Sequence, residues 1–166
     1  MPTTGALSTQ NLTDQLSPRP LARRLLATDA GWGASAARLA LAVVMFPHGA
    51  QKALGWFGGH GWSGTMGFLT QQIGLPAVLA AGVIVLELLA PLLLLVGLAT
   101  RAAALGIAAV MVGAVATVHL QHGFFMNWSG TQAGEGFEYH LLALGLAAAL
   151  VLGGGGRTSL DRLLSR

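Results

Sequence analysis

Four long apolar segments alternate with short polar segments along the chain, over residues 34–53, 77–98, 102–120 and 137–152. The second is the most apolar, because 14 of the 22 residues of Ala77–Leu98 are Val, Ile or Leu. As a helix it is about 33 Å long, enough to cross a hydrocarbon core of about 30 Å. Those side chains favour insertion by roughly 4–8 kcal/mol, which exceeds the roughly 3 kcal/mol that a central acid, here Glu87, costs. The pattern predicts an all-α integral membrane protein: an antiparallel bundle of four transmembrane helices over residues 34–156.

The segment before the first span, residues 1–33, is predicted to be a disordered or interfacial basic extension. Met1–Ser17 is rich in Ser, Thr, Gln and Asn and has no apolar core of a signal peptide. Pro20 can open a short helix over Leu21–Thr28, with leucines on one side and arginines on the other. Such a helix suits the surface of an anionic leaflet, and a basic tail without fixed structure is the alternative.

The connection after the first span is a glycine-rich turn, Gly55–Gly64, that carries Trp56, Phe57 and Trp62. Aromatic rings at such a point mark the membrane–water boundary. A phosphate-binding loop is a poor alternative, because the segment lacks GxxxxGK[ST] and no strand precedes it. Residues 65–73 are expected to form a short re-entrant or surface helix before the second span.

Small or unusual residues within the spans predict how the helices pack. Pro47 is expected to kink the first span near its outer end, and Arg38 to snorkel at its start. Ala109, Gly113 and Thr117 form a stripe of small residues on the third span that lets a neighbouring helix approach closely. The stripe permits a homo-oligomer and equally serves the packing of the bundle itself.

Composition agrees with a membrane protein, since 54% of the residues are hydrophobic and only 9% are charged. The nine Lys and Arg residues lie beside apolar segments instead of forming one basic face, so we exclude nucleic acid as a partner. The basic residues on one side of the predicted membrane are Arg19, Arg23, Arg24, Arg38, Arg101, Arg157, Arg162 and Arg166, whereas the other side has only Lys52. By the positive-inside rule both termini are cytoplasmic, and residues 157–166 form a cytoplasmic basic tail.

The chain contains no cysteine. Disulfide chemistry, thiolate nucleophiles and Fe–S ligation by this chain are therefore excluded. A redox role would have to use a bound cofactor, a quinone-like substrate or a partner subunit.

Ionisable side chains gather in the outer half of the predicted bundle. They are His48, Gln51 and Lys52 in the first span, Glu87 midway along the second, His119 and His122 at the end of the third, and Glu138 and His140 at the start of the fourth. A one-sided cluster of this kind is typical of a pocket or a proton path. Alternatively, the histidines face interfacial water, Lys52 anchors its helix end, and Glu87 hydrogen-bonds a neighbouring helix as a neutral acid. A Lys52–Glu87 pair requires that Pro47 turn the end of the first span inward.

Haem and metal are weighed on the same residues. His48 and His119 could face each other as axial haem ligands, and His119, Glu138 and His140 could hold a metal ion. No HxxxH or CxxCH spacing supports haem, and the metal site is weighed equally low, so we expect neither group to be bound.

Four motifs together resemble the DoxX family of small four-span bacterial membrane proteins, and the resemblance covers about residues 35–166. They are FPHGAQK at residues 46–52, GWFGGHGWSGTMGFL from residue 55, LELLAPLLLLVGLATRAAAL from residue 86, and GGGGRTSLDRLL from residue 153. The resemblance implies a helix bundle in the bacterial cytoplasmic membrane. It also implies a link with the membrane subunit of thiosulfate:quinone oxidoreductases and with oxidative-stress and quinone-detoxification systems. The missing cysteine agrees with a soluble oxidoreductase partner that supplies the sulfur chemistry.

The leading hypothesis is a quinone-interacting membrane subunit of an oxidoreductase. The quinone would lie in the outer half of the bundle, where His48, Lys52 and His119 hydrogen-bond or protonate its oxygens and Glu87 exchanges protons. Gln51 and His140 complete the predicted binding residues. Whether the chain is catalytic alone, and which substrate it takes, stay open.

Two other classes of function compete with this hypothesis. In the first, the chain is a non-catalytic scaffold whose loops recruit soluble oxidoreductase or stress-response partners, and Glu87 only supports packing. In the second it transports a small molecule or protons, which is disfavoured because the sequence has no evident inverted repeat or pair of broken helices.

Overall fold

The computed structural model describes residues 26–28 and 31–165, and these residues form helices and connecting loops without a strand. The helices are α3 (Trp32–Leu54), η1 (Trp56–Gly58), α4 (Gly61–Gly67), η2 (Phe68–Gln72), α5 (Ala77–Val96), α6 (Thr100–Ala114), η3 (Val115–His119), η4 (Leu120–His122), α7 (Glu138–Gly153) and α8 (Leu160–Leu164). The predicted disordered segment Met1–Ser17 and all but the last three residues of the predicted Leu21–Thr28 helix lie outside the described residues.

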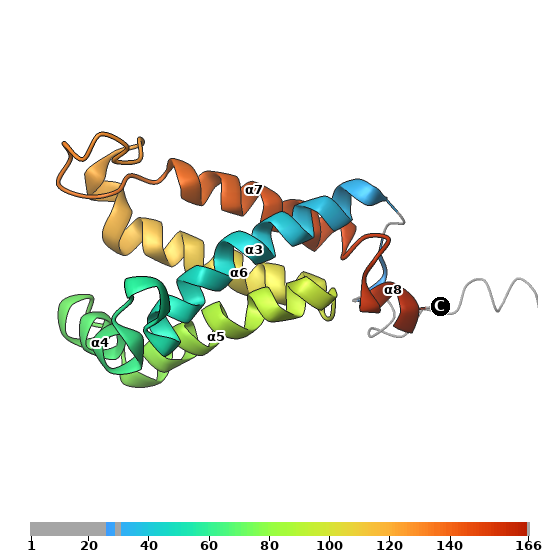
Figure 1. The fold of residues 1–166 in the computed structure, drawn as a ribbon, viewed down its shortest axis with the longest axis horizontal. Coiled ribbons are helices and arrows are strands. Elements are labelled where there is room, and N and C mark those ends of the chain that lie inside the picture. The colour runs from blue at the N-terminus through green and yellow to red at the C-terminus, as the bar shows by residue number, and fades with distance from the viewer. Residues whose placement is uncertain (1–25, 29–30, 166) are drawn as a thin grey trace, which may run out of the picture.

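Four helices, α3, α5, α6 and α7, pack side by side and run in alternating directions (Figure 1). The helix α3 packs against α5 and α7, and α6 packs against the same two helices from the other side. One end of the bundle, the tail end, carries α8 and the turn between α5 and α6. The opposite end, the loop end, carries η1, α4 and the loop of residues 123–137 (Figure 1).

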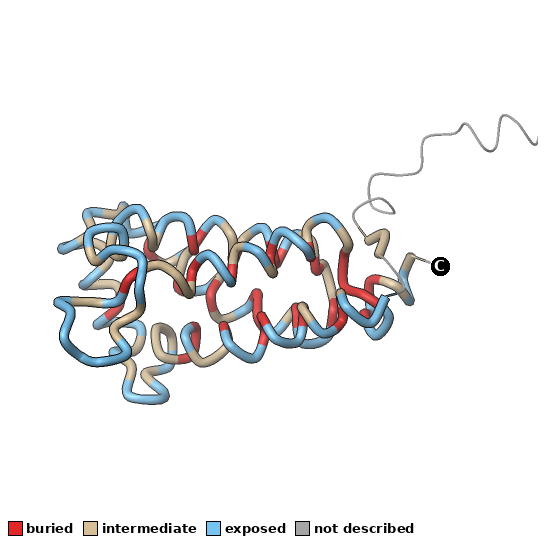
Figure 2. Tube along the Cα trace, turned by 90° about the horizontal axis from the view of Figure 1, so that it is seen from above, coloured by how far each residue is buried: buried red, intermediate tan, exposed pale blue. Residues whose placement is uncertain are grey.

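The buried residues form a stripe along the inner side of each long helix, and the outward sides are exposed (Figure 2). Alanines on all four helices, Ala42, Ala80, Ala104 and Ala147, are fully buried at the helix contacts. Small side chains at these positions allow the helices to approach closely, as in membrane bundles. The outward sides are covered with exposed Leu and Val residues, which is unfavourable in water and suits a lipid environment.

Two of the described helices are long and apolar enough to cross a membrane: α5, and the continuous helical segment Thr100–His122 formed by α6, η3 and η4. Only 33% of the apolar window of α5 and 22% of that of Thr100–His122 are buried inside the protein. The core helix of a soluble protein would be mostly buried, so these two helices have the character of membrane segments. The helix α7 is apolar but shorter, with 16 residues.

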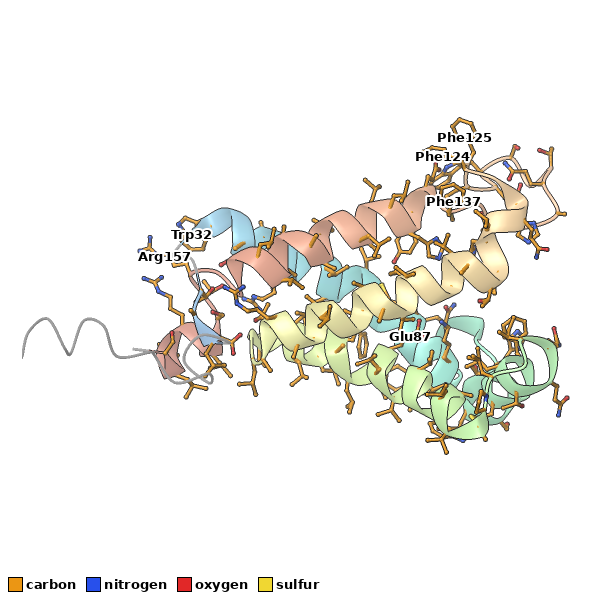
Figure 3. The ribbon with its side chains drawn as sticks, turned by 180° about the vertical axis from the view of Figure 1, so that it is seen from behind. Trp32, Glu87, Phe124, Phe125, Phe137 and Arg157 are labelled. Carbon is orange, nitrogen blue, oxygen red and sulfur yellow. The ribbon has the colours of Figure 1, made fainter. Side chains whose placement is uncertain are left out.

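Aromatic side chains lie at both ends of the bundle (Figure 3). At the tail end, the guanidinium of Arg157 lies 5.3 Å from the ring centre of Trp32. At the loop end, the rings of Phe125 and Phe137 each pack edge-on against Phe124. Two aromatic groups at opposite ends of an apolar bundle are typical of the two interfaces of a membrane.

The helices α3 and α5 cross in backbone contact at Gly49 and Glu87. A Cβ atom added to Gly49 would lie 2.5 Å from the carbonyl carbon of Glu87 and 2.7 Å from the backbone nitrogen of Leu88. Only glycine fits at this crossing. The helix α3 continues through Pro47 to Leu54, so the residues after the proline stay on the same helix.

Arg38 does not snorkel toward the membrane surface, which corrects the prediction from sequence. Its side chain is buried, and Nε donates to the carbonyl of Gly155 at 2.9 Å. Nη1 donates to the carbonyls of Leu94 and of Leu95, the latter at 2.8 Å. The last carbonyls of a helix lack partners within it and need donors in an apolar environment; that of Leu94 also accepts from the backbone nitrogen of the capping Gly97, at 3.1 Å. Arg38 supplies a further donor from α3.

The segment after α7 folds back onto the tail end of the bundle through Asp161, which is also buried. The carboxylate of Asp161 accepts hydrogen bonds from the backbone nitrogens of Ala99 at 2.7 Å and Thr100 at 2.8 Å. These are unpaired donors at the start of α6, so Asp161 caps that helix from α8. Arg101 in turn donates to the carbonyl of Leu152 near the end of α7, at 2.8 Å. The tail end is therefore closed by side chains that bind helix termini.

Candidate functional site

Lys52 and Glu87 form an ion pair between α3 and α5. Lys52 Nζ lies 2.6 Å from each carboxylate oxygen and donates a hydrogen bond to Oε1, whereas Oε2 is held by the ion pair alone and meets no further donor among the described residues. The Glu87 side chain is 1% exposed and that of Lys52 is 37% exposed. A buried carboxylate needs a cationic partner, and the close crossing at Gly49, three residues before Lys52, brings that partner to it. Glu87 lies in the half of the bundle nearer the loop end (Figure 3).

Three predicted site histidines lie around this pair at the loop end. The rings of His119 and His140 have centroids 4.1 Å apart. The ring of Tyr139 packs near both His140 and His48, at centroid distances of 5.4 Å and 5.7 Å. The structure therefore brings together residues of α3, α7 and η3 that are far apart in the sequence, as the topology predicted.

His119 has one ring nitrogen fixed by the loop. Its Nδ1 lies 2.9 Å from the carbonyl oxygen of Glu135. A carbonyl oxygen only accepts hydrogen bonds, so Nδ1 carries the hydrogen, and in the neutral ring Nε2 is the free proton acceptor. The loop thus sets which nitrogen of His119 is available for chemistry.

The other predicted polar residues serve the loops instead. Gln51 donates to the carbonyl of Phe57 at 3.2 Å and fastens η1 to α3. The carboxylate of Glu138 accepts from the backbone nitrogen of Met126 at 3.1 Å and from Trp128 Nε1 at 3.0 Å. His122 contacts Gln121 within the same turn. Within residues 26–28 and 31–165, no three His, Cys, Asp or Glu side chains are placed to hold a metal ion, so the geometry gives the His119–Glu138–His140 alternative no support.

A groove of about 640 Å³ opens between α5 and α6 next to these residues. Its polar lining consists of Lys52, Thr65, Thr117 and His119, and the rest is almost entirely apolar. The hydroxyl of Thr65 donates to the carbonyl of Lys52 at 3.1 Å, which ties α4 to the end of α3 and places α4 and η2 at the mouth of the groove. Thr65 carries no signal in the sequence that would have placed it here. A smaller hollow of about 350 Å³ lies within the exposed loop from Gln121 to Ala133.

The stripe of small residues on the third span lines this groove. Ala109, Gly113 and Thr117 all face it, and a Cβ atom added to Gly113 would meet nothing within 4 Å. Gly82 on α5 lines the same groove and is equally open. The predicted role of the stripe in packing the bundle is therefore wrong for the part of the chain that the structure describes. Its small side chains leave space.

A sequence model of the DoxX family matches residues 33–120, which is more than half of the chain. The chain belongs to the DoxX family. Together with the two apolar helices, membership indicates a membrane protein. Comparison with curated proteins and with solved structures gave no match.

The DoxX match covers the groove completely. Every groove residue lies between Lys52 and His119, and the Lys52–Glu87 pair lies in the same stretch. His140, α7 and α8 follow the matched region. The groove and the ion pair are thus features of the DoxX part of the chain, to which α7 adds the second histidine.

Proposed function

We propose that this DoxX protein is the quinone-interacting membrane component of a redox system and that the quinone occupies the groove between α5 and α6. The observation that carries the proposal is an apolar groove of about 640 Å³ that has Lys52 and His119 in its lining and a buried carboxylate, Glu87, behind Lys52. Ligand sites of this type combine an apolar lining with a few placed polar groups. A quinone has the matching chemistry, because its ring carries two oxygens and its tail is apolar.

The polar residues supply the two hydrogen-bonding states that a quinone needs. The ammonium of Lys52 donates to a quinone oxygen, and Nε2 of His119 accepts from the hydroxyl of the reduced form or, when protonated, donates to the oxidised form. Glu87 compensates the charge of Lys52 and can take up a proton. Interconversion of quinone and hydroquinone exchanges two electrons and two protons. These side chains exchange the protons. The electrons are exchanged with a soluble oxidoreductase partner, since the chain itself has no cysteine for redox chemistry.

The orientation that we propose places all four long helices across the bacterial inner membrane with the tail end in the cytoplasm. Among the described residues, Arg38, Arg101, Arg157 and Arg162 belong to the tail end and Lys52 to the loop end. This distribution supports the positive-inside orientation. The quinone groove then lies in the outer half of the membrane.

The test fills the groove without disturbing the backbone. In Gly113→Leu the new side chain enters open space in the groove, and in the matched control Gly145→Leu it enters open space on the outer side of α7. We expect the Kd for decylubiquinone, measured on the purified protein in nanodiscs, to rise at least tenfold in Gly113→Leu and to stay unchanged in Gly145→Leu. Equal affinities of the two variants would show that quinone does not use the groove.

A scaffold function is the second candidate, and one observation favours it. Trp128 is 87% exposed on the loop of residues 123–137, yet its indole nitrogen is held by Glu138. A large aromatic side chain held in place at the surface is typical of the centre of a protein interface. In this case Trp128→Ala would weaken retention of a soluble partner while quinone binding stayed as in the wild type.

A further inference from the structure

The pair of His119 and His140 has a geometry that quinone binding alone does not require. His119 lines the groove, whereas His140 does not. With Nδ1 bound to the carbonyl of Glu135, His119 exchanges protons only through Nε2. Its ring packs at a tilt of 44° against the ring of His140, with 4.1 Å between the centroids. His119 thus stands between the groove and a second imidazole deeper in the bundle.

His140 is an unusual buried group. His140 is only 5% exposed, and its Nδ1 has no hydrogen-bond partner within the described part of the chain. An unpaired buried nitrogen costs about 1–3 kcal/mol, so a ring kept in this state needs an explanation beyond packing. Because two positive charges at this ring separation repel each other strongly, His119 and His140 hold one proton between them more readily than two.

The titratable groups continue beyond His140 into the bundle. Lys52 and His48 on α3 lie close enough to His140 to interact with its charge. Glu87 interacts in the same way with His48 and with Tyr139. One oxygen of the Glu87 carboxylate, Oε2, is held only by the ion pair with Lys52 among the described residues.

The two carboxylates of the adjoining loop are already engaged. Glu138 binds Met126 and Trp128, and Glu135 accepts from the backbone nitrogen of Asn127 at 2.6 Å. Among the described residues, neither carboxylate forms an ion pair with a histidine. Among the described groups around His140, this leaves Glu87 and His48 as proton acceptors, with Lys52 as the cation that pairs with Glu87.

We propose that His119 and His140 share one proton and relay it between the groove and the buried Lys52–Glu87 pair. A proton accepted at Nε2 of His119 passes through a bridging water to Nδ1 of His140, which has no hydrogen-bond partner among the described residues, and from His140, through His48 or water, to Oε2 of Glu87. Only N–H and O–H bonds form and break, and no electron moves. The relay rests on the proposed function, because the bound quinone is the source of its proton. The sharing of one proton by the two histidine rings is independent of the proposed function.

The first experiment needs no ligand. The full chain with isotope-labelled histidine is reconstituted in nanodiscs, and the nitrogen signals of both rings are followed by NMR between about pH 8 and pH 5. We expect the two rings together to take up one proton, and His119 alone to take up a full proton in His140→Phe, which keeps the ring packing. If His140→Phe does not fold, His140→Gln is measured in its place. Two independent full titrations in the wild type would overturn the shared proton.

The second experiment adds decylubiquinol as the proton donor at saturating concentration. In the wild type we expect the His140 signals to shift although His140 does not line the groove. In His119→Asn, whose amide nitrogen can keep the bond to Glu135 but which lacks Nε2, the shift should be lost. An unchanged His140 response in His119→Asn would overturn the relay. If decylubiquinol does not bind the wild type at all, the quinone proposal fails, and the first experiment still decides whether the rings share a proton.

Discussion

Replacing Gly49 by alanine changes the crossing of α3 and α5 directly. The added Cβ atom would lie 2.5 Å from the carbonyl carbon of Glu87, whereas ordinary van der Waals contact begins at 3.4 Å. The obstructing atoms are backbone, so a side-chain rotation cannot relieve the clash. The carbonyl oxygen of Glu87 lies closer still to the added atom, so the two helices must separate by more than about 0.9 Å here, as set by the contact distances of close-packed interiors.

This separation acts on both stability and the ion pair. Overpacking at a close contact costs about 1–3 kcal/mol, and alanine returns about 0.5–1 kcal/mol of helix propensity. The same displacement would stretch the 2.6 Å hydrogen bond between Lys52 and Glu87 toward about 3.5 Å, the outer limit for such a bond. We expect Gly49→Ala to lose about 1–2 kcal/mol of unfolding free energy in total.

The matched control is Gly145→Ala, which makes the same chemical change at an open helical position. This variant should gain about 0.5–1 kcal/mol. Equilibrium unfolding in mixed micelles, followed by far-ultraviolet circular dichroism, compares the two. We expect a difference of about 2 kcal/mol, roughly 30-fold in the ratio of folded to unfolded protein. If the two alanine variants are equally stable, the helices do not cross in backbone contact and the account of the Lys52–Glu87 pair is wrong.

Two further predictions concern buried charges and use the same unfolding measurement. Asp161→Ala leaves the backbone nitrogens of Ala99 and Thr100 without an acceptor, so it should lose at least about 2 kcal/mol; a loss below about 0.5 kcal/mol would refute the cap. Lys52→Met leaves the carboxylate of Glu87 buried without its cation and should lose about 3 kcal/mol, near the lower end for broken buried pairs because Lys52 is partly exposed. The double variant Lys52→Met with Glu87→Gln should recover most of that loss, and no recovery would mean that the two residues do not interact.

The limits of the helices were predictable from the sequence because the chain marks them locally. The second span was expected over residues 77–98, and α5 spans Ala77–Val96 between Pro76 and Gly97. The fourth was expected over residues 137–152, and α7 spans Glu138–Gly153. An apolar run that ends at proline or glycine fixes a helix with little help from tertiary contacts.

The convergence of the site residues was also predictable, because helices that alternate in direction bring the end of one beside the start of the next. His48, His119 and His140 follow this rule. The role of Arg38 was not predictable, since its acceptors lie near residues 94 and 155 and no local pattern links them to it. Near a helix end, snorkelling and capping of another helix have the same sequence signature.

The groove could not be derived from the sequence for a different reason. A stripe such as Ala109, Gly113 and Thr117 fits a tight helix contact and a cavity equally well. Which of the two forms depends on how far apart α5 and α6 lie and on what α4 and η2 contribute at the mouth. Those are tertiary distances that a periodic pattern does not contain.

Photoaffinity labelling with an azido-quinone tests the central claim most directly. The reagent is activated on the protein in nanodiscs, and the labelled residues are mapped by mass spectrometry with and without excess decylubiquinone. The account predicts labels that excess quinone suppresses within residues 78–86 of α5 and 109–119 of α6 and η3. Labels confined to the loop of residues 123–137, or labels that excess quinone does not suppress, would contradict a quinone site in the groove.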